Sequence, residues 1–243
     1  MKVEIWSDVA CPWCHIGKRR FEAALDRFEH RDQIELEWKS FELDPSAQSQ
    51  GADGAADEGD YADRLARKYG TGRAGAQEML NTMTATAAAE GLNFHFEKAI
   101  KTNTFDAHQV IHLAGERGVQ DPVKERLLRG YFSEGAAVGD RRVLTQLGSE
   151  AGLDAAEVQA ALEDQRYAAA VREDEAEASR LGISAVPFFV VNRKYGIAGA
   201  QPADQILEVL EQAWAEAHPL VMATGRHAAE EAAPACGPDG CPT

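Results

Sequence analysis

The signals for β-strands lie only near the two ends of this chain, and this layout constrains the fold more than any other feature. Apolar and polar residues alternate over residues 2–5 and 34–39, with a helical pattern over 12–28 between them. Toward the other end, residues 187–191 and 195–199 predict a hairpin, which is followed by one more helical pattern. The predicted order is therefore βαβ, then a long helical block, then ββα.

A sheet whose two halves are separated by roughly 120 mostly helical residues is most simply one α/β domain that contains an all-α insertion. We predict the first part of the α/β domain over 1–50, the helical insertion over 51–178, the second part of the α/β domain over 179–217 and a flexible tail over 218–243.

Two local patterns refine this outline. Phe41 and Leu43 resume the alternation of the second strand on the opposite parity, which predicts a bulge or bend near Ser40. Residues that favour helix starts occur at three places in the insertion, at Asn103-Thr104, Asp121-Pro122 and Asp154. The insertion is therefore predicted to contain several helices.

The charge balance limits the partners of the chain. Its 243 residues include 25 lysines and arginines against 40 aspartates and glutamates, a formal net charge of −15. Nucleic acids and anionic membranes require a basic surface, so neither is an expected partner. The first eight residues include acids, unlike a secretory signal, and no stretch approaches the ~20 apolar residues of a membrane span. We therefore expect a soluble, cytoplasmic protein.

Four cysteines form two close pairs, and the first pair lies where the first strand meets the first helix. Cys11 is expected at the N-cap and Pro12 at the first helical position. The positive end of the helix favours a thiolate there, so Cys11 is predicted to attack a disulfide. Cys14 lies one turn along and can displace the resulting mixed disulfide. Trp13 adds an apolar surface beside the sulfur, so Pro12 and Trp13 are candidate substrate-binding residues.

The cysteines also have a metal-binding interpretation. CxxC is a common zinc-knuckle spacing, and Cys236 with Cys241 could supply a second pair of ligands. The first pair occupies a βα turn and the second a tail, which favours redox chemistry over zinc. Further electrostatic help for the first pair would have to come from the nearby His15 or Lys18.

The second pair could also take part in redox chemistry. Cys236 and Cys241 bracket Gly-Pro-Asp-Gly, a sequence that favours a turn and brings the two sulfurs within disulfide reach. A flexible linker of about 19 residues from the last helix spans roughly 25 Å, enough to sample much of the domain. We hypothesise that this pair exchanges electrons with Cys11 and Cys14 or regulates access to them. A passive terminal staple and a metal clip are the alternatives.

Val186-Pro187 opens the strand at which the sheet resumes. If the bond between them is cis, the backbone of Val186 is available to an extended substrate next to Cys11. From the position of Pro187 in the sequence alone, an ordinary trans bond is the more common arrangement.

Two further patterns have a simpler interpretation. Residues 70–75 match GxGxxG, but they follow a helical segment where a dinucleotide site needs a strand, so we predict a loop between helices. His108 and His112 lie four apart on one helical face. Because no third ligand is evident, a packing role is favoured over a metal site.

Several segments together resemble one known family. They are Ser7–Cys14 (SDVACPWC), Phe41–Pro45 (FELDP), Asn103–His108 (NTFDAH) and Gly182–Phe188 (GISAVPF). The combination is similar to the FrnE-type branch of the DsbA-like thioredoxin-fold family, over nearly the whole chain to about His218.

This resemblance implies a thioredoxin-like fold interrupted by a helical domain. It also implies Cys11 as the nucleophile, Cys14 as the resolving cysteine and a cis Pro187 opposite them. The related 2-hydroxychromene-2-carboxylate isomerases share this architecture, but they typically carry serine at the nucleophile position and use glutathione. The presence of both cysteines favours redox chemistry.

We therefore predict a thiol–disulfide oxidoreductase with disulfide isomerase activity, acting on protein or small disulfides. The enzyme would need no bound cofactor. Glutathione is a candidate co-substrate, and the sequence does not identify the electron donor. One alternative is a glutathione-dependent isomerase or transferase of the related branch. The other is a zinc or soft-metal module that uses all four cysteines.

Overall fold

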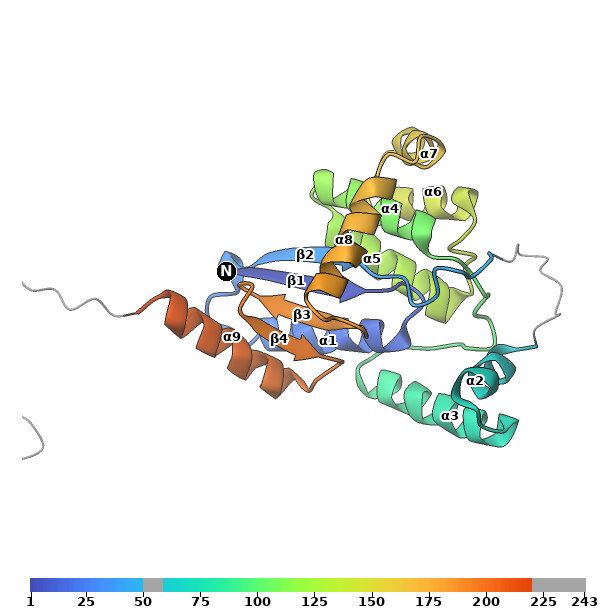
Figure 1. The fold of residues 1–243 in the computed structure, drawn as a ribbon, viewed down its shortest axis with the longest axis horizontal. Helices are drawn as coiled ribbons and strands as arrows, with labels where there is room; N and C mark the ends of the chain where they lie inside the picture. Colours follow the sequence, from blue (N-terminus) through green and yellow to red (C-terminus); the bar gives the residue numbers. More distant parts are fainter. Residues whose placement is uncertain (50–58, 220–243) are drawn as a thin grey trace, which may run out of the picture.

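The structure is a computed structural model that describes residues 1–49 and 59–219. Four strands in the described residues form one sheet in the order β2-β1-β3-β4 (Figure 1). Their bounds are β1 Lys2–Ser7, β2 Glu35–Ser40, β3 Phe188–Val191 and β4 Tyr195–Ala198. β1 pairs in parallel with β2 and antiparallel with β3, and β3 and β4 form the predicted hairpin. The two ends of the chain therefore meet at the centre of the sheet.

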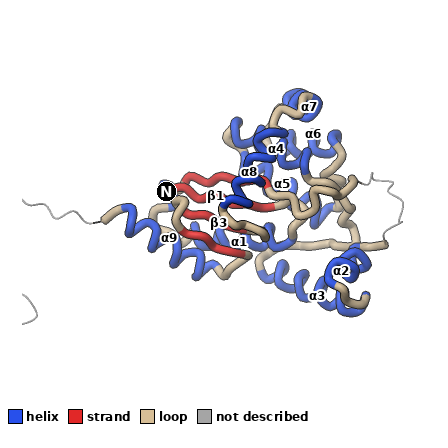
Figure 2. The backbone as a smooth tube through the Cα atoms, in the orientation of Figure 1, coloured by secondary structure: helices blue, strands red, loops and turns tan. Residues whose placement is uncertain are grey.

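Helix α1 (Pro12–Leu25) follows β1, and α9 (Ala203–Ala217) follows the hairpin. The helices between β2 and β3 are α2 (Tyr61–Tyr69), α3 (Arg73–Ala89), α4 (Phe105–Glu116), α5 (Gln120–Arg129), α6 (Arg141–Glu150), α7 (Ala155–Glu163) and α8 (Ala168–Arg180). A 3-10 turn (Arg31–Gln33) precedes β2, and a π-helical turn (Gly130–Glu134) continues α5. The predicted α/β fold class, with strands near both ends and helices between them, is confirmed (Figure 2).

Alternating side chains of the strands pack on opposite faces of the sheet. Ile5 belongs to the large hydrophobic cluster that also contains Phe21 of α1 and Ile206 of α9. Trp6, the next residue, lies in a smaller cluster with Ala178 of α8. Helix α8 runs across the strands, whereas α2 and α3 lie apart from the other helices that precede β3 (Figure 1).

The large cluster includes buried residues of both the sheet and the helices that separate its two halves. The two parts therefore share one core. The predicted boundaries of the insertion, at 51 and 178, stay predictions.

The expected continuation of β2 beyond Ser40 is wrong. Phe41 and Leu43 lie outside the strand, and Ser40 keeps the regular register of β2 without a bulge. Side chains take the backbone donors of this segment: the N–H of Ser40 donates to Asp174 (2.8 Å) and that of Leu43 donates to Asp8 (2.8 Å). Because these donors are satisfied elsewhere, the chain leaves the sheet and turns toward the first cysteine pair.

The predicted helix starts agree with the structure. The side chain of Asn103 accepts the N–H of Phe105 at the start of α4 (2.9 Å), and Pro122 lies in the first turn of α5. Asp154 caps α7 by accepting the N–H of Glu157 (2.9 Å).

The glycine-rich segment also lies where the sequence predicts it, between helices. Gly70 ends α2 in the left-handed region, with φ of +62°, and α3 begins at Arg73. Within the described part of the chain, the helices are too short or too polar to cross a bilayer.

Candidate active site

Cys11 lies at the N-cap of α1 with Pro12 at the first helical position, as the sequence predicts. The backbone N–H of Cys14 donates to the carbonyl of Cys11 (3.0 Å), which closes the first turn of the helix. Neither cysteine is in a disulfide, and both are buried, Cys11 at 4% exposure and Cys14 at 0%. Two thiols thus occupy the N-cap and the first turn of a helix.

Cys14 is the more protected of the two sulfurs. Burial raises the pKa of the Cys14 thiol well above its usual value, and the neighbouring Cys11 raises it further. The positive charge of Lys124 acts in the opposite direction. Because the thiolate is the reactive form, Cys14 is held largely as a thiol that does not attack spontaneously.

The Val186–Pro187 peptide bond is cis and lies against the nucleophile. The Cys11 thiol donates to the carbonyl oxygen of Val186, with sulfur and oxygen 3.6 Å apart. Gly17 of α1 permits this approach, since a Cβ there would lie 2.8 Å from Cγ of Pro187. The structure therefore brings Val186 and Pro187 next to Cys11 at the start of α1.

Asp8, the first residue of the turn after β1, connects this site to the helical block. Its carboxylate accepts the backbone N–H groups of Ala10 (3.2 Å) and Leu43 (2.8 Å), and its Oδ1 lies 3.6 Å from Nε2 of His108. Burial alone would raise the pKa of Asp8, but His108 and the N–H of Leu43 lower it overall. Asp8 is therefore an anion held at the edge of the cysteine turn.

The two histidines of α4 face different carboxylates. His108 faces Asp8, whereas Nε2 of His112 lies 3.0 Å from Oδ2 of Asp174. Among residues 1–49 and 59–219, no group of three or more His, Cys, Asp or Glu side chains is arranged to hold a metal ion. The geometry thus favours a structural role for both histidines, each beside a carboxylate.

The expectation that His15 or Lys18 supports the cysteines is wrong. Both side chains point to the face of α1 that packs on α5, where His15 lies 3.4 Å from Glu125. Lys18 lies 3.1 Å from Asp121 and 3.3 Å from Glu125, and it also pairs with Glu22. Their charges are therefore used to join α1 to the helical block.

The cation that acts on the cysteines is Lys124 of α5, which the sequence interpretation missed. It is 1% exposed, and both sulfurs act on it electrostatically. A signal was present in the sequence, because Lys124 interrupts an apolar stripe formed by Val123, Leu127 and Leu128. A charge on the buried face of a helix is uncommon without a function or a partner.

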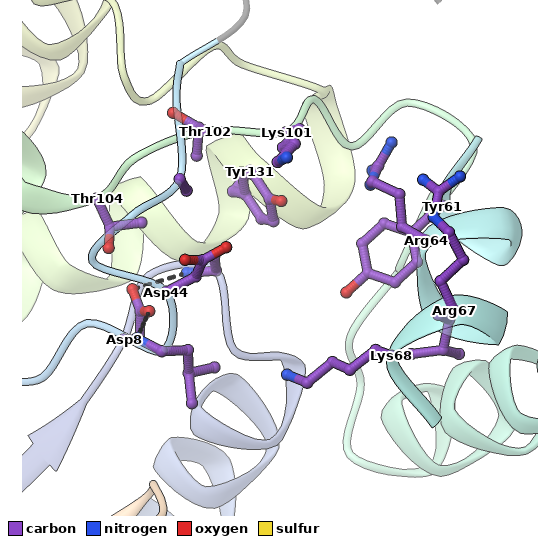
Figure 3. Close-up of a pocket in the computed structure, with 14 residues that line it drawn as sticks. Asp8, Asp44, Tyr61, Arg64, Arg67, Lys68, Lys101, Thr102, Thr104 and Tyr131 are labelled. Atoms are coloured by element: carbon purple, nitrogen blue, oxygen red, sulfur yellow. Dashed lines mark hydrogen bonds between the residues drawn. The ribbon is translucent and has the colours of Figure 1, made fainter. Parts of the chain in front are cut away.

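A pocket of about 460 Å³ adjoins the cysteine turn, and Asp8 and Ala10 form part of its wall. The carboxylates of Asp8 and Asp44 lie on one side of the pocket, and the side chains of Tyr61 and Lys68 of α2 lie on the other (Figure 3). Four cationic side chains line it, those of Arg64, Arg67, Lys68 and Lys101. In a chain of net charge −15 this is a local excess of positive charge.

A second hollow, of about 500 Å³, lies between Trp13 and helices α2 and α3, and shares Leu65 of α2 with the first pocket. Trp13 is 39% exposed, and Tyr69 and Met79 also expose large apolar surfaces there. Trp13, which lies between the two cysteines in the sequence, thus faces an apolar groove.

Comparison with known proteins decides the family. The model of the DSBA-like thioredoxin domain matches residues 2–211. This chain belongs to the DsbA-like thioredoxin domain family. Another protein in this comparison, the uncharacterized YwbO of Bacillus subtilis, is 29% identical over 192 residues, which are 78% of this chain and 86% of YwbO.

Solved structures agree with membership of the DsbA-like family. The probable DsbA oxidoreductase SCO1869 from Streptomyces coelicolor is 45% identical, with a TM-score of 0.81, over 100% of this chain and 99% of that one. The cytosolic disulfide reductase DsbM from Pseudomonas aeruginosa, solved with GSH, shares the fold at 18% identity and a TM-score of 0.61. The match covers 99% of the DsbM chain and 88% of this chain. The DsbA-like chain is therefore a thiol–disulfide oxidoreductase in general class, acting on disulfide-containing substrates.

Two predicted features of this DsbA-like chain fall outside the described residues. Cys236 and Cys241 lie beyond residue 219, so the second redox pair and the four-cysteine metal site stay predictions.

Proposed function

We propose that this protein reduces and isomerises disulfides in polypeptide substrates, with Cys11 as nucleophile and Cys14 as resolving cysteine. The observation that carries the proposal is the contact between the Cys11 sulfur and the Val186 carbonyl, 3.6 Å apart at the positive end of α1. A substrate strand that pairs with the backbone of Val186 would bring its disulfide to Cys11.

The reaction follows from this geometry. The Cys11 thiolate attacks one sulfur of the substrate disulfide, so a Cys11–substrate bond forms and the second substrate sulfur leaves as a thiolate. Cys14 then loses its proton and attacks Cys11. The Cys11–Cys14 disulfide forms, and the first substrate sulfur leaves as a second thiolate. The substrate gains two electrons, and a donor that supplies thiols must reduce the enzyme again.

Isomerase activity is supported by the burial of Cys14. Because burial raises the pKa of the Cys14 thiol, resolution is slow and the mixed disulfide with Cys11 persists. During that time a free thiol of the substrate can attack the mixed disulfide and release Cys11 with a rearranged pairing. The groove beside Trp13 supports a polypeptide substrate, since it offers apolar surface to an unfolded segment.

A glutathione-dependent reaction is the second candidate, and the basic pocket favours it. A small thiol with carboxylates would be attracted to Arg64 and Lys68, within a pocket that reaches the cysteine turn. Glutathione would then serve as the electron donor, which suits the cytoplasmic location expected from the sequence. The Cys236–Cys241 pair is a rival donor or regulator in this scheme.

The test is reduction of insulin by dithiothreitol, measured as turbidity. The native protein is expected to accelerate it, Cys11→Ser to lose the acceleration, and Cys14→Ser to accumulate mixed disulfides. Full activity in Cys11→Ser would contradict the proposal. Substitution of both Cys236 and Cys241 by serine distinguishes the donors, because unchanged turnover with glutathione would exclude a relay through the tail.

A further inference from the structure

A lysine buried without a carboxylate partner is the feature of the site that the proposed reaction has not yet used. Lys124 is 1% exposed, and the described residues place no carboxylate oxygen within 4.0 Å of its ammonium. Within residues 1–49 and 59–219, its ammonium makes one hydrogen bond, to the carbonyl oxygen of Ser7 at 3.5 Å. That contact is at the long limit of a hydrogen bond and compensates poorly for the loss of water.

The position of Lys124 is fixed from two sides. Its ammonium lies over the ring of Trp38, 5.5 Å from the centroid, and Ser7 is the last residue of β1. The cysteine turn begins at the next residue, so the side chain reaches from α5 to the end of β1 that leads into this turn. A cation held this way by a ring and a carbonyl keeps its charge free to act on a neighbour.

The charged groups around Lys124 come from three elements. Asp8 on the turn and Cys11, Cys14 and Lys18 on α1 all act on it electrostatically, and Asp8 is itself paired with His108 of α4. Lys18 is occupied by carboxylates of α1 and α5, and Asp8 by His108 and two backbone N–H groups. Among the described residues, Lys124 is thus the charged group of this set that has no oppositely charged side chain within ion-pair distance.

We propose that Lys124 is a positioning residue that makes Cys14 a competent resolving nucleophile by stabilising its thiolate. This proposal rests on the proposed function. In the resolving step Cys14 loses its proton to water, and the Lys124 ammonium lowers the energy of the resulting thiolate. The thiolate attacks Cys11, the Cys11–Cys14 bond forms and the bond from Cys11 to the substrate breaks, with the electron pair leaving on the substrate sulfur.

The charge balance of the site supports this assignment. Burial lowers the pKa of Lys124 to about 8, while Cys14, Asp8 and Cys11 oppose that shift. The same charge is what opposes the rise in the pKa of Cys14. Burying an unpaired cation costs free energy, so a lysine buried near a thiol that must ionise indicates a functional role.

A two-phase reaction tests the proposal directly. An aromatic disulfide, 5,5′-dithiobis(2-nitrobenzoate), releases one coloured thiolate when Cys11 attacks and a second when Cys14 resolves. Rapid-mixing absorbance therefore separates the two steps. All variants are made in the full chain with Cys236 and Cys241 replaced by serine, so that only the first cysteine pair reacts.

The substitution Lys124→Met is expected to slow the second phase at least about tenfold, because one nearby charge in a buried site has an effect of that order. Its pH profile should move to higher pH, while the first phase changes by less than about threefold. Lys124→Arg should restore most of the rate, and Lys39→Met, another lysine beside a tryptophan, should leave both phases unchanged. Far-ultraviolet circular dichroism checks that each variant is folded.

An unchanged second phase and pH profile in Lys124→Met would overturn this inference, as would equal slowing of both phases. Failure of the underlying function has a different signature, since the first phase would then survive at its native rate in Cys11→Ser.

Discussion

Two lysines lie beside tryptophans on opposite faces of the sheet, Lys39 half-buried and Lys124 buried, and they have opposite electrostatic environments. The ammonium of Lys39 on β2 lies 5.9 Å from the ring centroid of Trp6, and that of Lys124 lies 5.5 Å from the ring centroid of Trp38. Lys39 is 2.6 Å from Asp174 and 3.3 Å from Glu177, whereas Lys124 has no carboxylate partner among the described residues.

The pKa of each lysine follows from this difference. Burial acts to lower the pKa of Lys39, but Asp174 and the neighbouring glutamates raise it overall. For Lys124 burial wins, and the pKa falls to about 8. The comparison teaches that a similar lysine–tryptophan pair can join α8 to the sheet on one face and act on the reactive cysteines on the other. The two lysines differ in whether carboxylates lie within ion-pair distance of the ammonium.

The largest effect is expected from Lys39→Met. This change removes one of the two cationic or polar side chains that contact Asp174, a carboxylate that is 4% exposed, so the free energy of unfolding should fall by about 3 kcal/mol. Urea denaturation at pH 7 measures it. If the free energy of unfolding falls by less than about 0.5 kcal/mol, the ion pairing of Lys39 does not stabilise its face of the sheet.

A smaller effect is expected from Asp174→Asn, and it depends on pH. Burial would raise the pKa of Asp174, but His112, Lys39 and the N–H of Ser40 lower it overall. The resulting stabilisation is therefore complete above the unfolded pKa, near 4, and is lost as the pH falls through the lower folded pKa.

Unfolding followed by urea between pH 3 and pH 7 would show this behaviour. The variant should lose about 2 kcal/mol at pH 7, and its difference from the native protein should shrink toward low pH. A difference that stays constant over this range would show that the carboxylate charge has no part in the stability.

The smallest effect on stability is expected from Lys124→Met, and it should have the opposite sign. Replacing an unpaired buried ammonium by an apolar chain of similar length should leave the free energy of unfolding unchanged or raise it by about 1 kcal/mol. Thermal and urea unfolding at pH 7 measure it. A clear loss of stability would assign Lys124 to packing and would break the contrast with Lys39.

Local patterns predicted much of the fold and the reactive pair. Strand alternation near both ends and the proline after Cys11 were sufficient for the order of elements and for the N-cap position of the nucleophile. The error at Phe41 shows the limit of such patterns. Alternation continued there, but side chains from α8 and the cysteine turn took the backbone donors.

The resemblance to a family supplied what spacing alone could not, the cis bond before Pro187. The close approach of Pro187 to α1 was also missed, and it depends on Gly17, where a Cβ would lie 2.8 Å from Cγ of Pro187. The basic pocket was missed for another reason. Its walls come from α2, from the segment before α4 and from the cysteine turn, which are distant in sequence.

The sequence by itself determined the reactive sulfurs, because the strand-to-helix turn that positions Cys11 and Cys14 is built from neighbouring residues. Tertiary structure alone decided which charges reach them. His15 and Lys18 are adjacent in sequence, yet helix geometry turns them toward carboxylates of α5. Lys124 is 110 positions beyond Cys14, but packing of α5 on α1 and β2 buries it beside the sulfurs, where low polarity makes its charge effective.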